Sequence, residues 1–238
     1  MIFKHFSICF LISLNVCIAQ HFPANLHSKW NDLLQKHVSA AGLVDYKKFK
    51  DSKTDLDGYI KTLQANFVKI DSTSKSEKLA YWINTYNALT IDLILRNYPT
   101  KSIKQLKKPW KQKLWKFGNQ WLNLNDIEHQ ILRKMNEPRI HFAINCASMS
   151  CPILLNEAFT AQNIEKQLNR ATLLFLSDKS KNNITENNLQ LSKIFKWFEN
   201  DFKTEGSLID FLNLYTEIQI SNSAKISYLD YDWGLNGS

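Results

Sequence analysis

One long apolar segment constrains this chain more than any other part of it. The stretch SEKLAYWINTYNALTIDLILRNYP (76–99) repeats apolar side chains at helical spacing, at Leu79, Ile83, Tyr86, Leu89 and Leu93. Ser76 is placed to cap the start of the helix, and Pro99 follows its end. Because most of the intervening residues are also apolar, we expect this helix to be buried on most sides.

Two amides interrupt this apolar segment. Asn84 and Asn87 are three residues apart, so they share one helix face, with Tyr81 and Ile91 beside them. A buried polar group without a hydrogen-bond partner costs about 1–3 kcal/mol. The two amides therefore either tie neighbouring loops to the helix or face a cleft and bind a ligand there.

The remaining pattern predicts an α+β domain, because helical and strand-like segments follow each other without regular βαβ alternation. Helices are expected over 26–38, 49–66, 123–135, 160–178, 193–202 and 207–215, and strands over 139–145, 187–192 and 225–233. A hairpin is expected over 113–124, with Gly118 and Asn119 at its turn. With no repeat or linker in the chain, we expect a single, mainly helical domain with a small sheet.

The N-terminus predicts export. Residues 1–19 combine a basic start, an apolar stretch and small residues, Cys17 and Ala19, at the positions that a signal peptidase reads. The apolar stretch is too short to span a bilayer and is interrupted at Asn15. We expect a secreted or periplasmic protein without a transmembrane segment, with a helical lead-in over 20–41 and the main domain over 42–238. An uncleaved anchor is the alternative.

Basic charge is concentrated in one segment. Eight basic residues and no acidic residue occur between positions 93 and 125, which equals the net charge of +8 of the whole chain. Trp110, Trp115 and Trp121 lie among these lysines. The segment 101–121 either contacts an anionic partner, such as a glycan or a lipid headgroup, or is a solvated face above packed Trp side chains. Export argues against a nucleic-acid partner.

The segment RIHFAINCASMSCP (139–152) holds the two cysteines that remain after signal cleavage. In a straight strand, His141 and Asn145 share the more polar face, and Cys146 lies roughly 16 Å from His141. A turn in ASMS would bring Cys151 back beside Cys146. A disulfide, a thiol nucleophile served by a base, and a metal site with His141 all remain open.

Three acidic residues are candidates for functional roles. Glu128 falls inside the apolar stripe of the predicted helix 123–135, where a carboxylate is either paired with a cation or raised in pKa by burial. Asp230 and Asp232 share one face of the predicted last strand. Either aspartate is placed to orient a histidine, in the way the third member of a catalytic triad does.

Several segments together resemble one family, the uncharacterised domain of unknown function 547. The resemblance runs in order from about Gly42 to the end, over EKLAYWINTYNALTI, SIK…PW, LNDIEHQILR, PRIHFAINCASMSCPIL, IFKWFENDF and YDWGLN. It supplies no established activity. The order of helix, histidine strand and aspartate strand is vaguely similar to papain-like and transglutaminase-like folds. In those folds the nucleophilic cysteine starts the core helix, where this chain has Asn84 and Asn87.

Two classes of function follow from these residues. The first is a cysteine-dependent hydrolase or acyl transferase acting on an envelope peptide or amide. Its candidate catalytic residues are Cys146 or Cys151 as nucleophile, His141 as base, and Glu128 or Asp232 as the group that orients the base. Candidate ligand-binding residues are Asn84, Asn87, Asn145 and Trp110.

The second class is a non-catalytic binding or scaffolding domain. In it Cys146 and Cys151 form a disulfide, and the segment 101–121 contacts a peptide, a glycan or another envelope component. Neither class requires a cofactor, and we expect none.

Export is testable by mass. The mature protein isolated from the native envelope or medium is expected to begin after Ala19, because that is where the small residues required by signal peptidase occur. Intact-mass measurement checks this, and a mass that includes residues 1–19 would contradict it.

Overall fold

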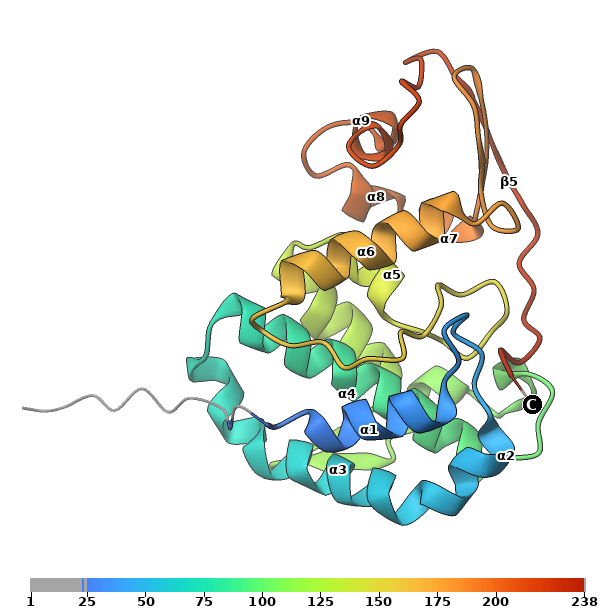
Figure 1. The fold of residues 1–238 in the computed structure, drawn as a ribbon. Helices are drawn as coiled ribbons and strands as arrows, with labels where there is room; N and C mark the ends of the chain where they lie inside the picture. Colours follow the sequence, from blue (N-terminus) through green and yellow to red (C-terminus); the bar gives the residue numbers. More distant parts are fainter. Residues whose placement is uncertain (1–22, 24, 238) are drawn as a thin grey trace, which may run out of the picture.

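A single buried helix lies at the centre of the molecule. The computed structural model describes residues 23 and 25–237, so the predicted signal peptide lies outside the described residues. Helix α4 (Lys75–Arg96) is buried at every position from Leu79 to Leu95, and the other elements surround it (Figure 1). The predicted burial of this helix is confirmed.

The start of α4 differs from the prediction by two residues. Ser74, rather than Ser76, is the N-cap, and its hydroxyl accepts a hydrogen bond from the backbone N–H of Glu77. The Glu77 carboxylate in turn accepts from the backbone N–H of Ser74. This capping box needs a glutamate three residues after the cap, and only Ser74 has one.

Three helices of the N-terminal part pack along one side of α4 (Figure 1): α1 (Ser28–His37), α2 (Tyr46–Phe49) and α3 (Lys53–Asn66). The 3-10 turn η1 (Lys50–Ser52) joins α2 to α3, and η2 (Phe67–Ser72) joins α3 to α4. The Trp30 ring of α1 stacks on the Tyr59 ring of α3, with 5.7 Å between centroids. Both rings belong to the same hydrophobic core as α4.

The predicted hairpin is confirmed and is anchored to α4 by a buried carboxylate. Strands β1 (Trp115–Phe117) and β2 (Gln120–Leu122) pair antiparallel on either side of Gly118 and Asn119. The side chain of Asp92 has no solvent exposure and accepts a hydrogen bond of 2.7 Å from the Trp115 indole. Arg96 and Lys53 bind the same carboxylate at 2.7 and 3.0 Å. The short turns η3 (Ile103–Gln105) and η4 (Pro109–Lys111) lead into the hairpin.

One sequence prediction about the middle of the chain is wrong, and a second is confirmed with a different helix type. The segment 139–145 is not a strand but contains a one-turn helix, α5 (Ile140–Ala143), and all four of its side chains are buried. Alternation carries no information when every position is buried, which is why the strand was predicted. The predicted helix 123–135 is present and is capped by Asn123, whose side chain accepts from the Asp126 N–H at 2.8 Å. It is formed by a π-helical segment, η5 (Asp126–Ile131), and a 3-10 turn, η6 (Leu132–Met135), rather than by a regular α-helix.

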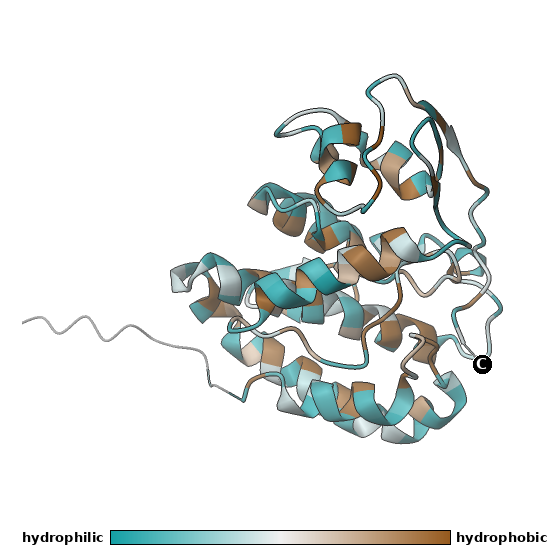
Figure 2. Cartoon of the chain, turned by 45° about the horizontal axis from the view of Figure 1, so that its top comes forward, coloured by the Kyte–Doolittle hydropathy of each residue, from teal (hydrophilic) through white to brown (hydrophobic). Residues whose placement is uncertain are grey.

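The C-terminal part covers the opposite side of α4. Helix α6 (Ile164–Ser177) buries Ile164, Leu168, Ala171 and Phe175 on one face, and its alternating hydrophobic and hydrophilic bands are visible in Figure 2. It is followed by β3 (Asn183–Ile184), β4 (Asn188–Leu191), α7 (Lys193–Trp197), α8 (Glu199–Phe202), α9 (Leu208–Asn213) and β5 (Lys225–Tyr228).

Strand β4 pairs antiparallel with β3 and parallel with β5. Strand β5 ends five residues earlier than predicted. After it the chain leaves the sheet and runs down the molecule to Val44, where Gly237 forms a parallel bridge (Figure 1). The molecule is therefore α+β, about half helical with two small sheets, as predicted. A relationship to papain-like or transglutaminase-like folds stays a prediction. No helix within residues 25–237 is long and apolar enough to cross a bilayer.

The hairpin anchor gives a stability prediction. Asp92→Ala is expected to lower the free energy of unfolding by about 3 kcal/mol, because it leaves the buried Trp115 indole N–H and the Arg96 guanidinium without their acceptor. Asp55→Ala, which removes an exposed ion pair with Lys29, is the matched control and is expected to change stability little. Urea denaturation measures both, and equal effects would contradict the anchoring role.

Candidate functional site

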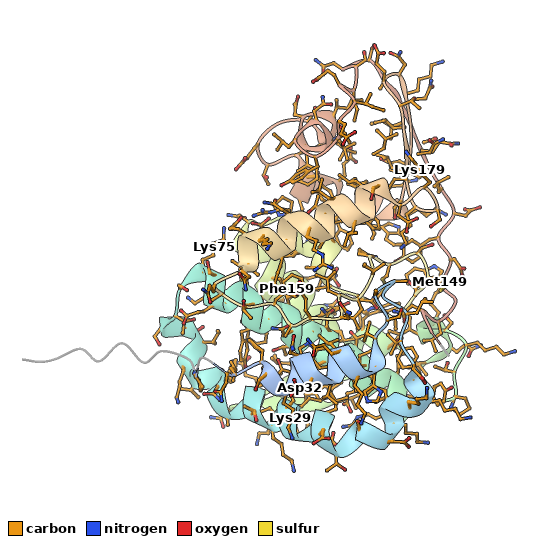
Figure 3. All side chains as sticks on the ribbon, in the orientation of Figure 1. Lys29, Asp32, Lys75, Met149, Phe159 and Lys179 are labelled. Atoms are coloured by element: carbon orange, nitrogen blue, oxygen red, sulfur yellow. A yellow bond between two sulfur atoms is a disulfide. The ribbon has the colours of Figure 1, made fainter. Side chains whose placement is uncertain are left out.

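The two amides of α4 hold the loops that build the site. The Asn87 side chain donates to the Ala143 carbonyl at 3.0 Å and accepts from the Asn145 backbone N–H at 2.9 Å. Asn84 brackets Phe159 in the same way, at 2.8 and 3.0 Å; Figure 3 labels Phe159 between α6 and α4. Both side chains are buried, and the amide N–H and C=O groups of each form hydrogen bonds with backbone groups. Of the two predicted roles, the two amides therefore have the first: they tie loops to the helix. Neither amide lines the cavity described below.

Asn145 folds the cysteine loop. Its amide donates to the Pro152 carbonyl at 2.7 Å and accepts from the Ala147 N–H at 2.7 Å. Its oxygen also accepts from the Asn236 amide at 3.2 Å. Ala147 has φ +60°, a left-handed conformation that tightens the turn. Asn145 therefore shapes the loop from within and is absent from the cavity wall.

The loop brings the two cysteines together. Their Cα atoms are 6.3 Å apart and their sulfur atoms lie at disulfide distance. The Cys151 sulfur accepts hydrogen bonds from the Cys146 backbone N–H at 3.0 Å and from the Tyr231 hydroxyl at 3.2 Å. The Ser148 hydroxyl lies 3.2 Å from the Cys146 sulfur. A metal site finds no support, since no three His, Cys, Asp or Glu side chains among the described residues are grouped to hold one.

The sulfur pair faces a cavity of about 580 Å³. Both cysteines line it, together with His141, Glu128 and Trp110, which the sequence had singled out from separate segments. The remaining lining residues share an aromatic or basic character for the most part; they are Tyr86, Lys108, Pro109, Lys111, Asn125, His129, Ile144, Pro152, Ile194, Trp197, Phe198, Tyr231 and Trp233. In Figure 3 the cysteine loop, marked by Met149, lies next to the C-terminal segment, and the Met149 N–H donates to the Gly234 carbonyl at 2.8 Å.

A buried histidine on the cavity wall is oriented by an ion pair. Nε2 of His141 lies 2.8 Å from the Asp201 carboxylate, which Arg133 also binds through two nitrogens at 2.6 and 2.7 Å. Burial alone raises the pKa of Asp201, but the hydrogen bonds from Arg133 and His141 outweigh it and leave that pKa well below its usual range. Asp201 is therefore ionised, and its carboxylate accepts a hydrogen bond from the Nε2–H of His141.

The other nitrogen of His141, Nδ1, is buried and has no hydrogen-bond partner among the described residues. Burial lowers the pKa of His141, and the neighbouring Asp201 offsets this only in part, so the ring is neutral at pH 7. With the proton on Nε2, Nδ1 carries the lone pair, and within the described chain it has no hydrogen-bond partner. The ring stacks on Phe198 with 4.0 Å between centroids, which fixes its plane. This is the state that a general base requires.

Glu128 provides a second titratable group on the same cavity. It is buried, and its carboxylate accepts a hydrogen bond of 3.3 Å from the Tyr86 hydroxyl. Burial raises the pKa of Glu128 to about 7, only partly opposed by Tyr86 and Arg133. Near neutral pH this side chain therefore exchanges between a proton donor and a carboxylate. The sequence predicted either pairing with a cation or a pKa raised by burial, and the raised pKa is the alternative that the structure supports.

The predicted orienting role of Asp232 is corrected by the structure. Because β5 ends at Tyr228, Asp232 lies on an exposed turn, where its carboxylate accepts from the Gly234 N–H at 2.7 Å. Asp230 is exposed and pairs with Lys193 at 2.9 Å. The group that orients His141 is Asp201, which sequence reasoning missed although it lies in the segment IFKWFENDF. The only local sign was an acid among aromatic residues, Phe198 and Phe202.

The fold and the cavity define an α+β protein in which an Arg–Asp–His network and a cysteine pair share an aromatic-lined cavity. The family model "Protein of unknown function, DUF547" matches residues 70–176, and this is the family that the resemblance predicted. No curated protein and no solved structure matches the chain.

The buried carboxylate makes stability depend on pH. The pKa of Glu128 is about 7 in the folded state against 4.5 for the ordinary group, so the folded state retains a proton that the unfolded state has lost. Its contribution is fully present below pH 4.5 and is lost as the pH rises through about 7. The wild-type protein is expected to lose about 3 kcal/mol over this window relative to Glu128→Gln.

Urea denaturation at several pH values measures this difference. The same substitution at the exposed Glu205 is the control and is expected to leave the pH dependence unchanged. Parallel pH profiles for wild type and Glu128→Gln would show that Glu128 does not hold its proton in the folded state.

Proposed function

We propose that this chain is an exported, cysteine-dependent hydrolase or acyl transferase that acts on a peptide or amide of the cell envelope. The observation that carries the proposal is the state of His141: it is neutral, oriented by Asp201, has a buried Nδ1 without a hydrogen-bond partner, and lines the same cavity as the sulfur pair. A nucleophile, a base and a group that orients the base are the three parts that covalent catalysis of acyl transfer needs.

Cys151 is the better nucleophile of the two cysteines. Its sulfur accepts hydrogen bonds from a backbone N–H and from the Tyr231 hydroxyl, and both donors stabilise a thiolate. While the two sulfurs are joined, neither can attack. The enzyme therefore needs a dithiol reductant, which gives two protons and two electrons to the disulfide and is itself oxidised to a disulfide.

The reaction then follows from the residues on the cavity. Nδ1 of His141 accepts the thiol proton, and the thiolate attacks the carbonyl carbon of the substrate amide. His141 returns the proton to the leaving amine as the C–N bond breaks, which leaves a thioester on the cysteine. Water or a second amine releases the acyl group. Glu128, protonated below about pH 7, is a hydrogen-bond donor on the same wall.

The second candidate function is a non-catalytic binding domain, and the disulfide distance between Cys146 and Cys151 favours it. In that case the pair braces the loop, and the cavity binds its ligand without covalent chemistry. Trp121, half exposed on the hairpin, and the lysines around it belong to the contact surface in this reading.

Thiol labelling distinguishes the two. After mild reduction, Cys151 is expected to react with a chloroacetamide probe much faster than Cys146, as read from peptide mass spectra. His141→Ala and Asp201→Asn are expected to slow this reaction by about tenfold or more, because the thiolate depends on the oriented base. His27→Ala, which alters a histidine that does not line this cavity, is the control and is expected to react like wild type.

Circular dichroism and the melting temperature establish that each variant is folded. Cys151 labelling that is no faster in folded wild type than in urea-unfolded chain would contradict the enzyme and leave the binding domain. The same holds if the folded protein yields no free thiol after reduction.

A further inference from the structure

The mouth of the cavity is basic. Lys108 and Lys111 both line it, on either side of the buried Pro109. Both lysines are exposed, and within residues 25–237 neither forms an ion pair. The one carboxylate on the described cavity wall is Glu128, which is protonated below about pH 7. The charged groups that face a ligand there are therefore predominantly positive.

The position of Lys108 is structurally enforced. Its backbone is left-handed, with φ +47° and ψ +54°, a conformation that non-glycine residues rarely adopt. The turn is held by the Lys111 N–H, which donates to the Lys108 carbonyl at 2.9 Å. The Gln112 amide also donates to the Lys107 carbonyl at 2.8 Å. A strained residue maintained at a cavity mouth is a reason to look for a ligand that it meets.

Aromatic rings form the wall behind these lysines. Trp233 lies edge-to-face with Trp110 at 5.8 Å, stacks with Trp197 at 5.7 Å and contacts Tyr231 at 4.5 Å, all between centroids. Lys104 lies over the Trp233 ring at 5.1 Å but does not line the cavity. Such a wall takes an apolar group, while the lysines take an anion.

We propose that the ligand of this cavity is a short N-acylated peptide with a free carboxylate, which Lys108 and Lys111 bind while the acyl end lies against the aromatic wall. The volume of about 580 Å³ suits a ligand of drug-like size rather than a segment in the middle of a polymer. The peptide class rests on the proposed function. In that reaction the carboxylate stays on the leaving amine, so the lysines also position the scissile amide.

Calorimetric titration of the protein in its oxidised form tests the proposal without turnover. The probes are N-acetyl-phenylalanyl-alanine and its C-terminal amide, which differ only in the carboxylate. Wild type is expected to bind the acid about tenfold or more tightly than the amide at low ionic strength, since a charge-assisted hydrogen bond is lost in the amide. The preference is expected to weaken with added salt.

Variants locate the effect. In the double variant Lys108→Gln, Lys111→Gln the acid and the amide are expected to bind equally. The control is Lys113→Gln, Lys116→Gln, which removes the same charge from exposed positions of the same basic segment that do not line the cavity; it is expected to keep the preference. Trp110→Ala is expected to weaken both probes by a similar factor.

Three results would overturn the proposal. One is equal binding of acid and amide by wild type. Another is an equal loss of preference in the two double variants, which would make the effect one of net charge. The third is lysine-dependent binding of a uronic acid disaccharide without binding of either peptide. If the protein binds the carboxylate probe selectively but shows no reactive thiol, the proposed ligand class is supported and only the proposed enzymatic activity is contradicted.

Discussion

The structure depends on hydrogen bonds from two amides inside the most apolar helix of the chain. Asn84 and Asn87 each pair with a backbone N–H and a backbone C=O of a loop that would otherwise bury unsatisfied polar groups against α4. A hydrophobic side chain in their place would leave two unpaired backbone groups, at a cost of about 1–3 kcal/mol each. Asn87 also ties α5 and the cysteine loop directly to the centre of the core.

This attachment explains how a site made from distant segments is held in one geometry. His141 lies on α5, next to Phe142, whose ring packs against Phe175 of α6 and Phe202 of α8 at 5.1 and 5.6 Å between centroids. The same contact places Asp201, the neighbour of Phe202, beside the His141 ring. The charge states follow from this packing. Asp201 is ionised because Arg133 and His141 donate hydrogen bonds to it, whereas burial lowers the pKa of His141 and raises the pKa of Glu128 to about 7.

Local sequence patterns were sufficient for the elements that have one clear periodicity or one clear turn. Helix α4, the hairpin at Gly118 and strand β4 are of this kind. Helix α5 was mistaken for a strand because its four residues are all buried, so no periodicity distinguishes the two. The mistake mattered, since a straight strand separates His141 from the cysteines. The interruption of an apolar stripe by Glu128 did indicate burial. Asp201, by contrast, lies 60 residues from His141 in sequence, and no local pattern reveals such a pairing.

The segment that follows β5 completes the cavity wall. Tyr231 contacts both sulfurs, Trp233 completes the aromatic wall, and Asn236 hydrogen-bonds to Asn145 and to the Tyr46 hydroxyl. During synthesis these residues follow every other part of the cavity. A nascent chain that has reached residue 225 already contains its histidine, its aspartate and both cysteines. Until Tyr231 and Trp233 dock, part of the cavity wall is absent and Cys151 lacks the Tyr231 hydroxyl as a hydrogen-bond donor.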